Sequence, residues 1–353
     1  MKLLRSCLVG IFKGISVIGW AEAYSLPSDL MTADAEVTDA LQWGYSLANF
    51  GEIMQPCLDA AGTKTLLEIG SFRGELTEEL LDWAKGSGAE ISTVEPLPPN
   101  DLLDLVKRRP ELTLIEDTGV GALESLDSLP DTIIIDGDHN YFTLTQELNK
   151  IAGMSGDGPL PFLLFHDVCW PHERRDTYYA PERIPESERQ PLGHDCTISP
   201  GNPGLSDGGL PYEWAADHEG GPKNGVLTAI EDFMADRDGL QLAVVPVFFG
   251  MGLLWETSAP WADEVARLIA PFDRNPVMIR AEANRVAHLV RGHVDAAEIR
   301  KLNARLARQE ELLARMLQSS ALGIAERLSN LKQRGNPIFT RQEIQDLLDR
   351  KGE

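Results

Sequence analysis

Two short segments of the chain place carboxylates and imidazoles side by side. Asp136, Asp138 and His139 follow one apolar run, and His166 and Asp167 follow the next. An imidazole has an unperturbed pKa of about 6.5, which suits a general base that takes a proton from a hydroxyl at neutral pH. His139 and His166 are therefore the candidate bases, with Asp136 beside them at the catalytic centre. The alternative for His139 is a structural hydrogen bond that orients its loop.

Five apolar runs separated by helix-forming segments must position these side chains. The runs begin at Thr65, Ile91, Leu112, Asp131 and Pro161. This alternation predicts a parallel β-sheet with helices on its faces. In such a sheet the carboxyl ends of the strands lie along one edge, where ligands bind. We therefore expect the polar residues that follow the runs to share one pocket.

The first run passes directly into a turn with glycines at both ends, Gly70 and Gly74. Gly70 permits backbone angles that a Cβ obstructs, and Gly74 lets the following helix come close to a ligand. The second run ends at Glu95, where a carboxylate can accept both hydroxyls of a ribose. The pattern predicts a nucleotide-type cofactor, and an ordinary strand-to-helix turn is the alternative. The dinucleotide fingerprint Gly-x-Gly-x-x-Gly is not matched, which disfavours NAD.

Together with three further segments, these motifs resemble class I S-adenosylmethionine-dependent methyltransferases, and among them small-molecule O-methyltransferases of the macrocin and cephalosporin-cluster type. The resemblance covers roughly residues 41–256 and rests on the segments 68–74, 94–96, 135–141, 166–170 and 224–233. It implies a Rossmann-like α/β fold with a seven-stranded sheet, mostly parallel, and helices on both faces. The last strand is expected to be antiparallel, and the adjacent apolar runs 240–249 and 251–255 predict the closing hairpin.

The resemblance also implies a cofactor and a set of contacts. S-adenosyl-L-methionine is the expected cofactor, and the methyl acceptor is expected to be a hydroxyl of a small molecule such as a sugar or a secondary metabolite. The residues expected to bind the cofactor are Glu68, Gly70, Ser71, Gly74, Glu95, Asp117, Thr118 and Asp136. Among them, Glu95 would hold the ribose, and Asp117 and Thr118 would lie beside the adenine.

Metal dependence is left open by the sequence. In metal-dependent members, carboxylates at these strand ends hold Mg²⁺, which acidifies the acceptor hydroxyl, and the implied ligands here are Asp136 and Asp167. His166 departs from the Asp or Glu that is usual at its position, and imidazole favours Mn²⁺ or Fe²⁺ over Mg²⁺. Without a metal, His139 or His166 would act as the general base.

A segment without periodicity, residues 168–224, follows the reactive strand end and predicts a lid over the substrate. Aromatic side chains there can stack on a ring, and arginines can neutralise an anionic group. The candidate substrate residues are Trp170, Arg174, Arg175, Tyr178 and Tyr179. The alternative is a folded loop whose arginines pair with nearby carboxylates.

Composition narrows the class of partner. The formal net charge is −23, which repels nucleic-acid phosphates and argues against a DNA or RNA substrate. The four cysteines, at positions 7, 57, 169 and 196, have neither Cys-x-x-Cys spacing nor a disulfide framework, so we expect reduced thiols and a cytoplasmic protein.

The two ends of the chain differ from its centre. Residues 1–36 contain an amphipathic pattern interrupted by Lys13, which fits a helix that docks on protein, a helix on a membrane surface, or a cleaved signal. Residues 258–353 are predicted to be a helical extension in which 297–318 have near-heptad spacing. That spacing predicts either a coiled coil that forms a homodimer or a helix packed on the domain.

The predicted organisation is thus a methyltransferase domain at 37–257 between these two terminal segments. The competing functional hypothesis is a scaffold or binding protein in which a methyltransferase-like domain has lost its activity. The intact polar strand ends favour the enzyme.

Overall fold

The computed structural model describes residues 44–332 and 340–349. Two compact units divide the chain, one ending at Val290 and the other beginning at Arg291. The predicted amphipathic segment 1–36 lies outside the described residues. Within the described parts, no helix combines the length and the apolar character that crossing a membrane requires.

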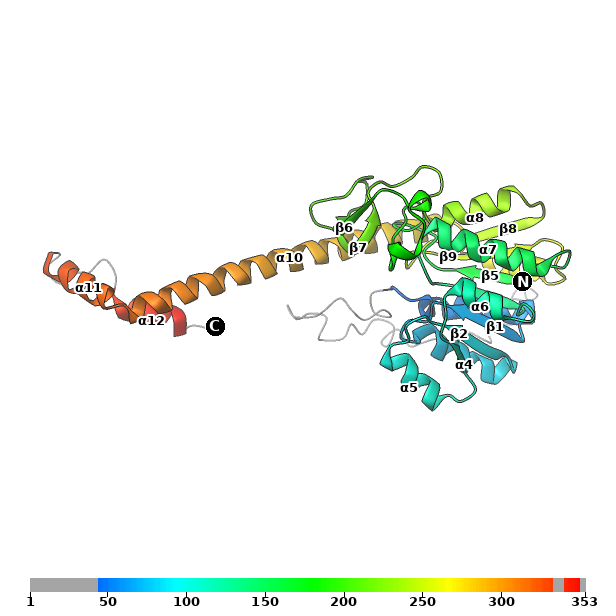
Figure 1. Ribbon diagram of the computed structural model, residues 1–353, viewed down its shortest axis with the longest axis horizontal. Helices are drawn as coiled ribbons and strands as arrows, with labels where there is room; N and C mark the ends of the chain where they lie inside the picture. The colour runs from blue at the N-terminus through cyan, green and yellow to red at the C-terminus, as the bar shows by residue number, and fades with distance from the viewer. Residues whose placement is uncertain (1–43, 333–339, 350–353) are drawn as a thin grey trace, which may run out of the picture. The chain divides into compact units, whose positions relative to one another are not determined.

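The first unit contains a seven-stranded sheet in the order β3-β2-β1-β4-β5-β9-β8 (Figure 1). The strands are β1 (Thr65–Ile69), β2 (Glu90–Val94), β3 (Thr113–Ile115), β4 (Thr132–Ile135), β5 (Phe162–Phe165), β8 (Leu240–Val245) and β9 (Met251–Glu256). Strand β9 runs antiparallel to both of its neighbours, and the pairs formed by β1 to β5 are parallel. The predicted Rossmann-like fold with an antiparallel last strand is therefore confirmed.

Helices cover both faces of this sheet. One core packs it against α3 (Gly51–Ala61), α4 (Glu75–Ser87), α5 (Asn100–Arg108) and α9 (Ala262–Ile269), and the other against α6 (Gly119–Ser125), α7 (Tyr141–Ser155) and α8 (Val226–Ala235). Successive strand residues point to opposite faces, so Ile134 joins the first core and Ile133 the second. Because both faces are buried, the strands are continuous apolar runs.

The first unit continues past residue 257, where the sequence predicted that the methyltransferase domain ends. Helix α9 buries Val265 and Ile269, and the start of α10 (Pro276–Gln318) buries Val286 and Leu289. The second unit contains the rest of α10, α11 (Ser320–Lys332) and α12 (Arg341–Asp349).

Within the predicted lid, the structure has more order than its sequence indicated. Strands β6 (Leu192–Ile198) and β7 (Leu210–Ala216) form an antiparallel hairpin, joined by a connection rich in Gly, Pro and Ser. The short helical turns η3 (Pro181–Arg183) and η4 (Glu186–Glu188) precede it, and η2 (Leu47–Phe50) precedes α3. The sequence did not predict these two strands, because the many turn residues around β6 and β7 are typical of loops.

Gly70 allows the ends of β1 and β4 to come together. Its φ is +89°, and a Cβ at this position would lie 2.2 Å from the carbonyl oxygen of Asp136. The amide of Asp136 in turn donates to the carbonyl of Ile69 at 2.8 Å. The glycine is therefore required by the crossing of two chain segments at the site edge.

We expect Gly70→Ala to lower the free energy of unfolding by about 3 kcal/mol or more, because it combines an unfavourable backbone angle with a backbone clash. Gly88→Ala is the matched control, since Gly88 has a φ of +68° and no heavy atom within 4 Å of its Cβ position. The control should lose only about 1 kcal/mol. Urea unfolding of both variants measures the difference, and equal losses would contradict the role assigned to the Asp136 contact.

Candidate functional site

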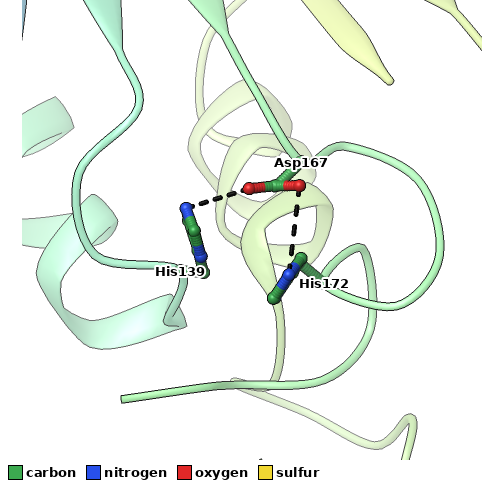
Figure 2. Close-up of side chains that lie close together, drawn as sticks. All are labelled: His139, Asp167 and His172. Carbon is green, nitrogen blue, oxygen red and sulfur yellow. Dashed lines mark ion pairs between the residues drawn. The ribbon is translucent and has the colours of Figure 1, made fainter. Parts of the chain in front are cut away.

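The carboxylate of Asp167 lies between two imidazoles at the end of β5 (Figure 2). Its Oδ2 is 2.9 Å from Nε2 of His139, and its Oδ1 is 3.9 Å from Nε2 of His172. The His139 contact has the distance of an ion pair, but its angle falls short of a hydrogen bond. Nδ1 of His166 also lies 3.6 Å from Oδ2, so three imidazoles surround one carboxylate that is only 4% exposed.

Neighbouring strands bring these residues together. Strands β4 and β5 pair in parallel with Ile135 opposite Phe165, so the residues that follow each strand lie at the same level. Asn140 caps α7 by accepting a hydrogen bond from the amide of Thr143 at 2.8 Å, which fixes the turn that contains His139. Asp167 itself has a φ of +58°. Strained backbone of this kind is common at functional sites.

The cluster carries strongly perturbed pKa values. Burial alone would lower the pKa of His139, but the electrostatic effects of Tyr179 and Asp167 raise it well above its usual value. Burial would also lower the pKa of His166, but the negative charges of Asp167 and Asp136 outweigh it and raise this pKa to about 9. Burial would raise the pKa of Asp167, but the charges of His166 and His139 lower it well below its usual range. The carboxylates and at least two imidazoles thus stabilise one another's charge.

Both ring nitrogens of His166 already have partners. Nε2 lies 2.9 Å from the carbonyl oxygen of Phe248, which can only accept, and Nδ1 lies 3.1 Å from Oδ1 of Asp136. The side chain is 2% exposed. His166 therefore has no nitrogen directed at a bound acceptor, and we now assign it to orienting Asp136 instead of to proton transfer.

The sequence analysis missed His172. Its Nδ1 bonds the hydroxyl of Thr177 at 3.1 Å, and its Nε2 lies 3.3 Å from the hydroxyl of Tyr212. Its ring centroid is 4.5 Å from that of His139. Burial lowers the pKa of His172 to about 3, which keeps this imidazole neutral. The loop between His166 and His172 has no periodicity, so only the folded chain reveals their proximity.

A small recess opens beside the cluster. It is lined by Ile135, Asp136, Gly137, Asp138, His139, Leu144, Phe165, His166 and Val226, and the free space inside it is about enough for one water molecule. The recess is therefore a narrow gap beside the cluster and does not enclose a ligand.

The turn after β1 and the end of β2 meet at the neighbouring part of the same edge. Oε2 of Glu95 accepts a hydrogen bond from the amide of Phe72 at 3.1 Å. Ser71 is buried, and its hydroxyl has no hydrogen-bond partner within the described chain. An unsatisfied buried hydroxyl is costly unless a ligand or water completes it. These two residues fit a bound polar cofactor.

Other predicted cofactor residues have partners within the protein. Gly74 has a φ of +90°, and a Cβ there would meet the side chain of Leu105 at 2.8 Å, so helix packing also requires this glycine. Asp117 accepts a hydrogen bond from the amide of Thr118 at 2.7 Å, and Thr118 caps α6. Asp117 and Thr118 lie at the turn after β3, where they were expected to be beside the adenine of the cofactor.

Glu68 is buried and faces away from solvent. Its Oε2 accepts hydrogen bonds from the hydroxyls of Thr77 at 2.6 Å and Thr93 at 3.1 Å. Burial raises the pKa of Glu68 to about 8, and the two hydroxyl donors only partly oppose it. Glu68 therefore ties β1 to α4 and β2, and a direct contact with the cofactor is not its main role.

A second buried carboxylate anchors the lid. Asp176 accepts hydrogen bonds from the amides of Tyr141 and Gly225 and from the hydroxyl of Tyr178. The amide of Asp176 donates to the side chain of Asn224 at 2.7 Å. Asp176 thus fastens the first part of the lid to the starts of α7 and α8 and to Asn224 at the other end of the lid.

Three predicted substrate residues make structural contacts instead. Arg174 pairs with Glu231, Arg175 is 1% exposed and donates to the carbonyls of Ala216 and Pro203, and Tyr178 is buried on Asp176. In this structure these three side chains stabilise the lid and its contact with α8, as in the alternative of a folded loop.

The other two predicted substrate residues differ from them. Tyr179 is 71% exposed, with its ring centroid 5.6 Å from that of His139. Trp170 packs on a small core that contains Phe249 and Leu289. Of the five, Tyr179 alone is both exposed and beside the cluster.

Comparisons with known proteins give only distant similarities. No family model and no curated protein matches the chain. Similar solved structures include the SAH-bound methyltransferase PaMTH1 of Podospora anserina, 17% identical, which covers 72% of this chain and 97% of its own with a TM-score of 0.41. A putative O-methyltransferase from Klebsiella pneumoniae is 16% identical. The similarity covers 67% of this chain and 94% of the Klebsiella protein, with a TM-score of 0.39.

Human N-acetylserotonin methyltransferase in complex with SAM is 13% identical to this chain. The similarity covers 61% of this chain and 55% of the human protein, with a TM-score of 0.33. Similarity this low says nothing about substrate or site residues. The fold assignment rests on the strand order and direction of the sheet itself.

The pKa of Glu68 makes stability depend on pH. Between about pH 4.5 and 8 the folded protein keeps a proton that the unfolded chain releases, so this carboxyl stabilises the fold at low pH and less as pH rises. We expect Glu68→Gln to reduce the fall in unfolding free energy across this range, by up to about 1.4 kcal/mol per pH unit. Denaturant titrations at pH 5, 6, 7 and 8 measure it, with Glu90→Gln at the exposed start of β2 as the control. Parallel pH profiles for wild type and Glu68→Gln would rule out the titration.

Proposed function

We propose that this protein is an S-adenosylmethionine-dependent methyltransferase that methylates a hydroxyl of a small molecule. One observation carries the proposal: a cofactor-type carboxylate, Glu95 beside the glycine turn, shares a sheet edge with the cluster of Asp136, His139 and Asp167. A transferase needs this combination, because the methyl donor and the acceptor's proton must be handled next to each other. The net charge of −23 supports a small acceptor over a nucleic acid.

The residues around the glycine turn would hold the cofactor. Glu95 is assigned to the ribose hydroxyls, and the unpartnered hydroxyl of Ser71 to a polar group of the cofactor. Asp117 and Thr118 are assigned to the adenine end. When bound, S-adenosylmethionine supplies an activated methyl group, so the protein need only align the acceptor and remove its proton.

For the acceptor side, we propose that Asp136 and Asp167 hold a first-row transition metal together with His139 and His172. Ligand atoms of His139, Asp167 and His172 all lie within 4.8 Å of one another, as do those of Asp136, His166 and Asp167. A mixed set of imidazoles and carboxylates suits Mn²⁺, Fe²⁺ or Zn²⁺ better than Mg²⁺. Such an ion would lower the pKa of an acceptor hydroxyl. Tyr179 is placed to contact the acceptor.

A cytoplasmic location completes the proposal. The described cysteines, Cys57, Cys169 and Cys196, are all free thiols. Free thiols are the usual state in a reducing compartment.

The cofactor assignment predicts a binding defect. We expect Glu95→Ala to weaken binding of S-adenosylhomocysteine at least ~10-fold, because the ribose loses two charge-assisted hydrogen bonds. Isothermal titration calorimetry of wild type, Glu95→Ala and Glu90→Ala measures this, and Glu90→Ala should bind like wild type. Normal affinity in Glu95→Ala would refute the ribose assignment. If the wild-type protein binds neither S-adenosylhomocysteine nor S-adenosylmethionine, the scaffold hypothesis replaces the enzyme.

The metal assignment predicts selective ion binding. After treatment with EDTA and dialysis, the protein should bind Mn²⁺ or Zn²⁺ at least ~10-fold more tightly than Mg²⁺. Asp167→Asn should weaken Mn²⁺ binding by a factor of at least ~10, because it removes a charged ligand. Asp195→Asn is the control, since Asp195 is an exposed carboxylate beside His194 in β6, away from the cluster.

Calorimetry with each ion measures these affinities, and thermal melting checks that the variants are folded. Absence of ion binding to the wild-type protein would remove the metal from the proposal.

A further inference from the structure

The second unit contains a long helical segment with many exposed apolar side chains. Between Arg291 and Gln318, helix α10 has no buried side chain. Several of its large apolar residues are strongly exposed: Ile299 at 42%, Leu302 at 53%, Leu306 at 52%, Leu312 at 51% and Met316 at 40%. Helices of this length are stabilised mainly by packing of an apolar face, so exposed leucines in this number indicate a binding partner.

Four of these five exposed residues, all except Leu312, fit the core positions of a heptad pattern. With Ile299 as position a, the core positions a and d are occupied by Ile299, Leu302, Leu306, Gln309, Leu313 and Met316. The spacing alternates between three and four residues throughout, which keeps the apolar stripe facing one side of a supercoiled helix. We propose that residues 298–317 pair with the same segment of a second copy of this chain as a parallel two-stranded coiled coil.

Charge complementarity selects a second copy in the parallel direction. In a parallel pair, position g of one helix faces position e of the next heptad in the other. Arg305 occupies g and Glu310 occupies the following e, so opposite charges meet twice across the dimer. Leu312 and Leu317 occupy the next g and e positions and make an apolar contact there. In an antiparallel pair, g faces g, and Arg305 would lose its acidic partner.

Gln309 fixes the register of this pairing. It is the polar residue among six core positions, and in the parallel dimer it faces its own counterpart, with which its amide can exchange hydrogen bonds. A shift by one heptad would place Gln309 against Leu302 or Met316 and leave its amide unsatisfied. A single polar core residue specifies register and strand number in this way at some loss of stability.

Sedimentation of the full-length protein over a range of concentrations tests the pairing. We expect the wild type to form a dimer and Leu306→Asp to weaken association at least ~100-fold, because two charges would enter the seam. Ala304→Asp is the matched control on the opposite face of the same helix, at position f, and should leave the dimer intact. A monomeric or trimeric wild type, or a dimer that Leu306→Asp does not weaken, would overturn the proposal.

Two further variants test direction and register. Leu306→Cys should form a disulfide-linked dimer on mild oxidation, because a parallel pair places position 306 opposite itself, whereas the wild type should not. Arg305→Glu and Glu310→Arg should each weaken the dimer ~2–10-fold, and the double variant should restore it. Failure of both the crosslink and the restoration would overturn the parallel arrangement. The variants in residues 298–317 should bind S-adenosylhomocysteine like the wild type. Failure of the dimer and failure of the proposed methyltransferase function can therefore be told apart.

Discussion

The structure of the candidate site depends on how the charges of two carboxylates, the buried Asp167 and the half-buried Asp136, are compensated. Asp167 is 4% exposed, and a charge removed from water at this depth is tolerated only with partners of opposite sign or with a metal ion. His139 and His166 provide those partners in the protein, and His172 adds a neutral imidazole on the other side. Loss of His139 or His166 would leave negative charge uncompensated in a low-dielectric environment. The cluster is thus a single electrostatic unit.

This unit is supported by elements far away in the sequence. Glu282, near the start of α10, accepts hydrogen bonds from the amides of Phe248 and Phe249 at 3.0 and 2.9 Å. The carbonyl of Phe248 then receives Nε2 of His166, whose Nδ1 faces Asp136. A helix beyond the expected end of the domain therefore fixes the orientation of the central imidazole. This connection is one of the contacts that join the start of α10 to the compact unit, which ends at Val290.

The lid follows the same principle, since one buried acid orders a long segment that is poor in regular structure. Asp176 accepts hydrogen bonds from the amides of Tyr141 at the start of α7 and of Gly225 just before α8, and its own amide donates to Asn224 at the other end of the lid. The arginines that appeared suited to an anionic substrate are part of this internal framework, with Arg175 bound to two backbone carbonyls. Specificity would then depend on residues such as Tyr179 that remain exposed beside the cluster.

Local pattern was sufficient for the sheet and for the residues that end its strands. Apolar runs such as 131–135 and the glycine turn at 70–74 depend on short-range rules, so the parallel strands and the edge at which they end were predictable. The seven-stranded sheet with its antiparallel last strand was implied by the family resemblance, and the strand order came from the structure. The partners of Glu68, Arg175 and His166 were not, because each bond joins residues separated by at least nine positions, whose encounter is decided by packing. His172 joins the cluster through a loop without periodicity. The sequence determined which chemical groups are available at the sheet edge, and the tertiary structure decided which of them are used internally and which face a ligand, because burial and long-range contacts exist only in the folded chain.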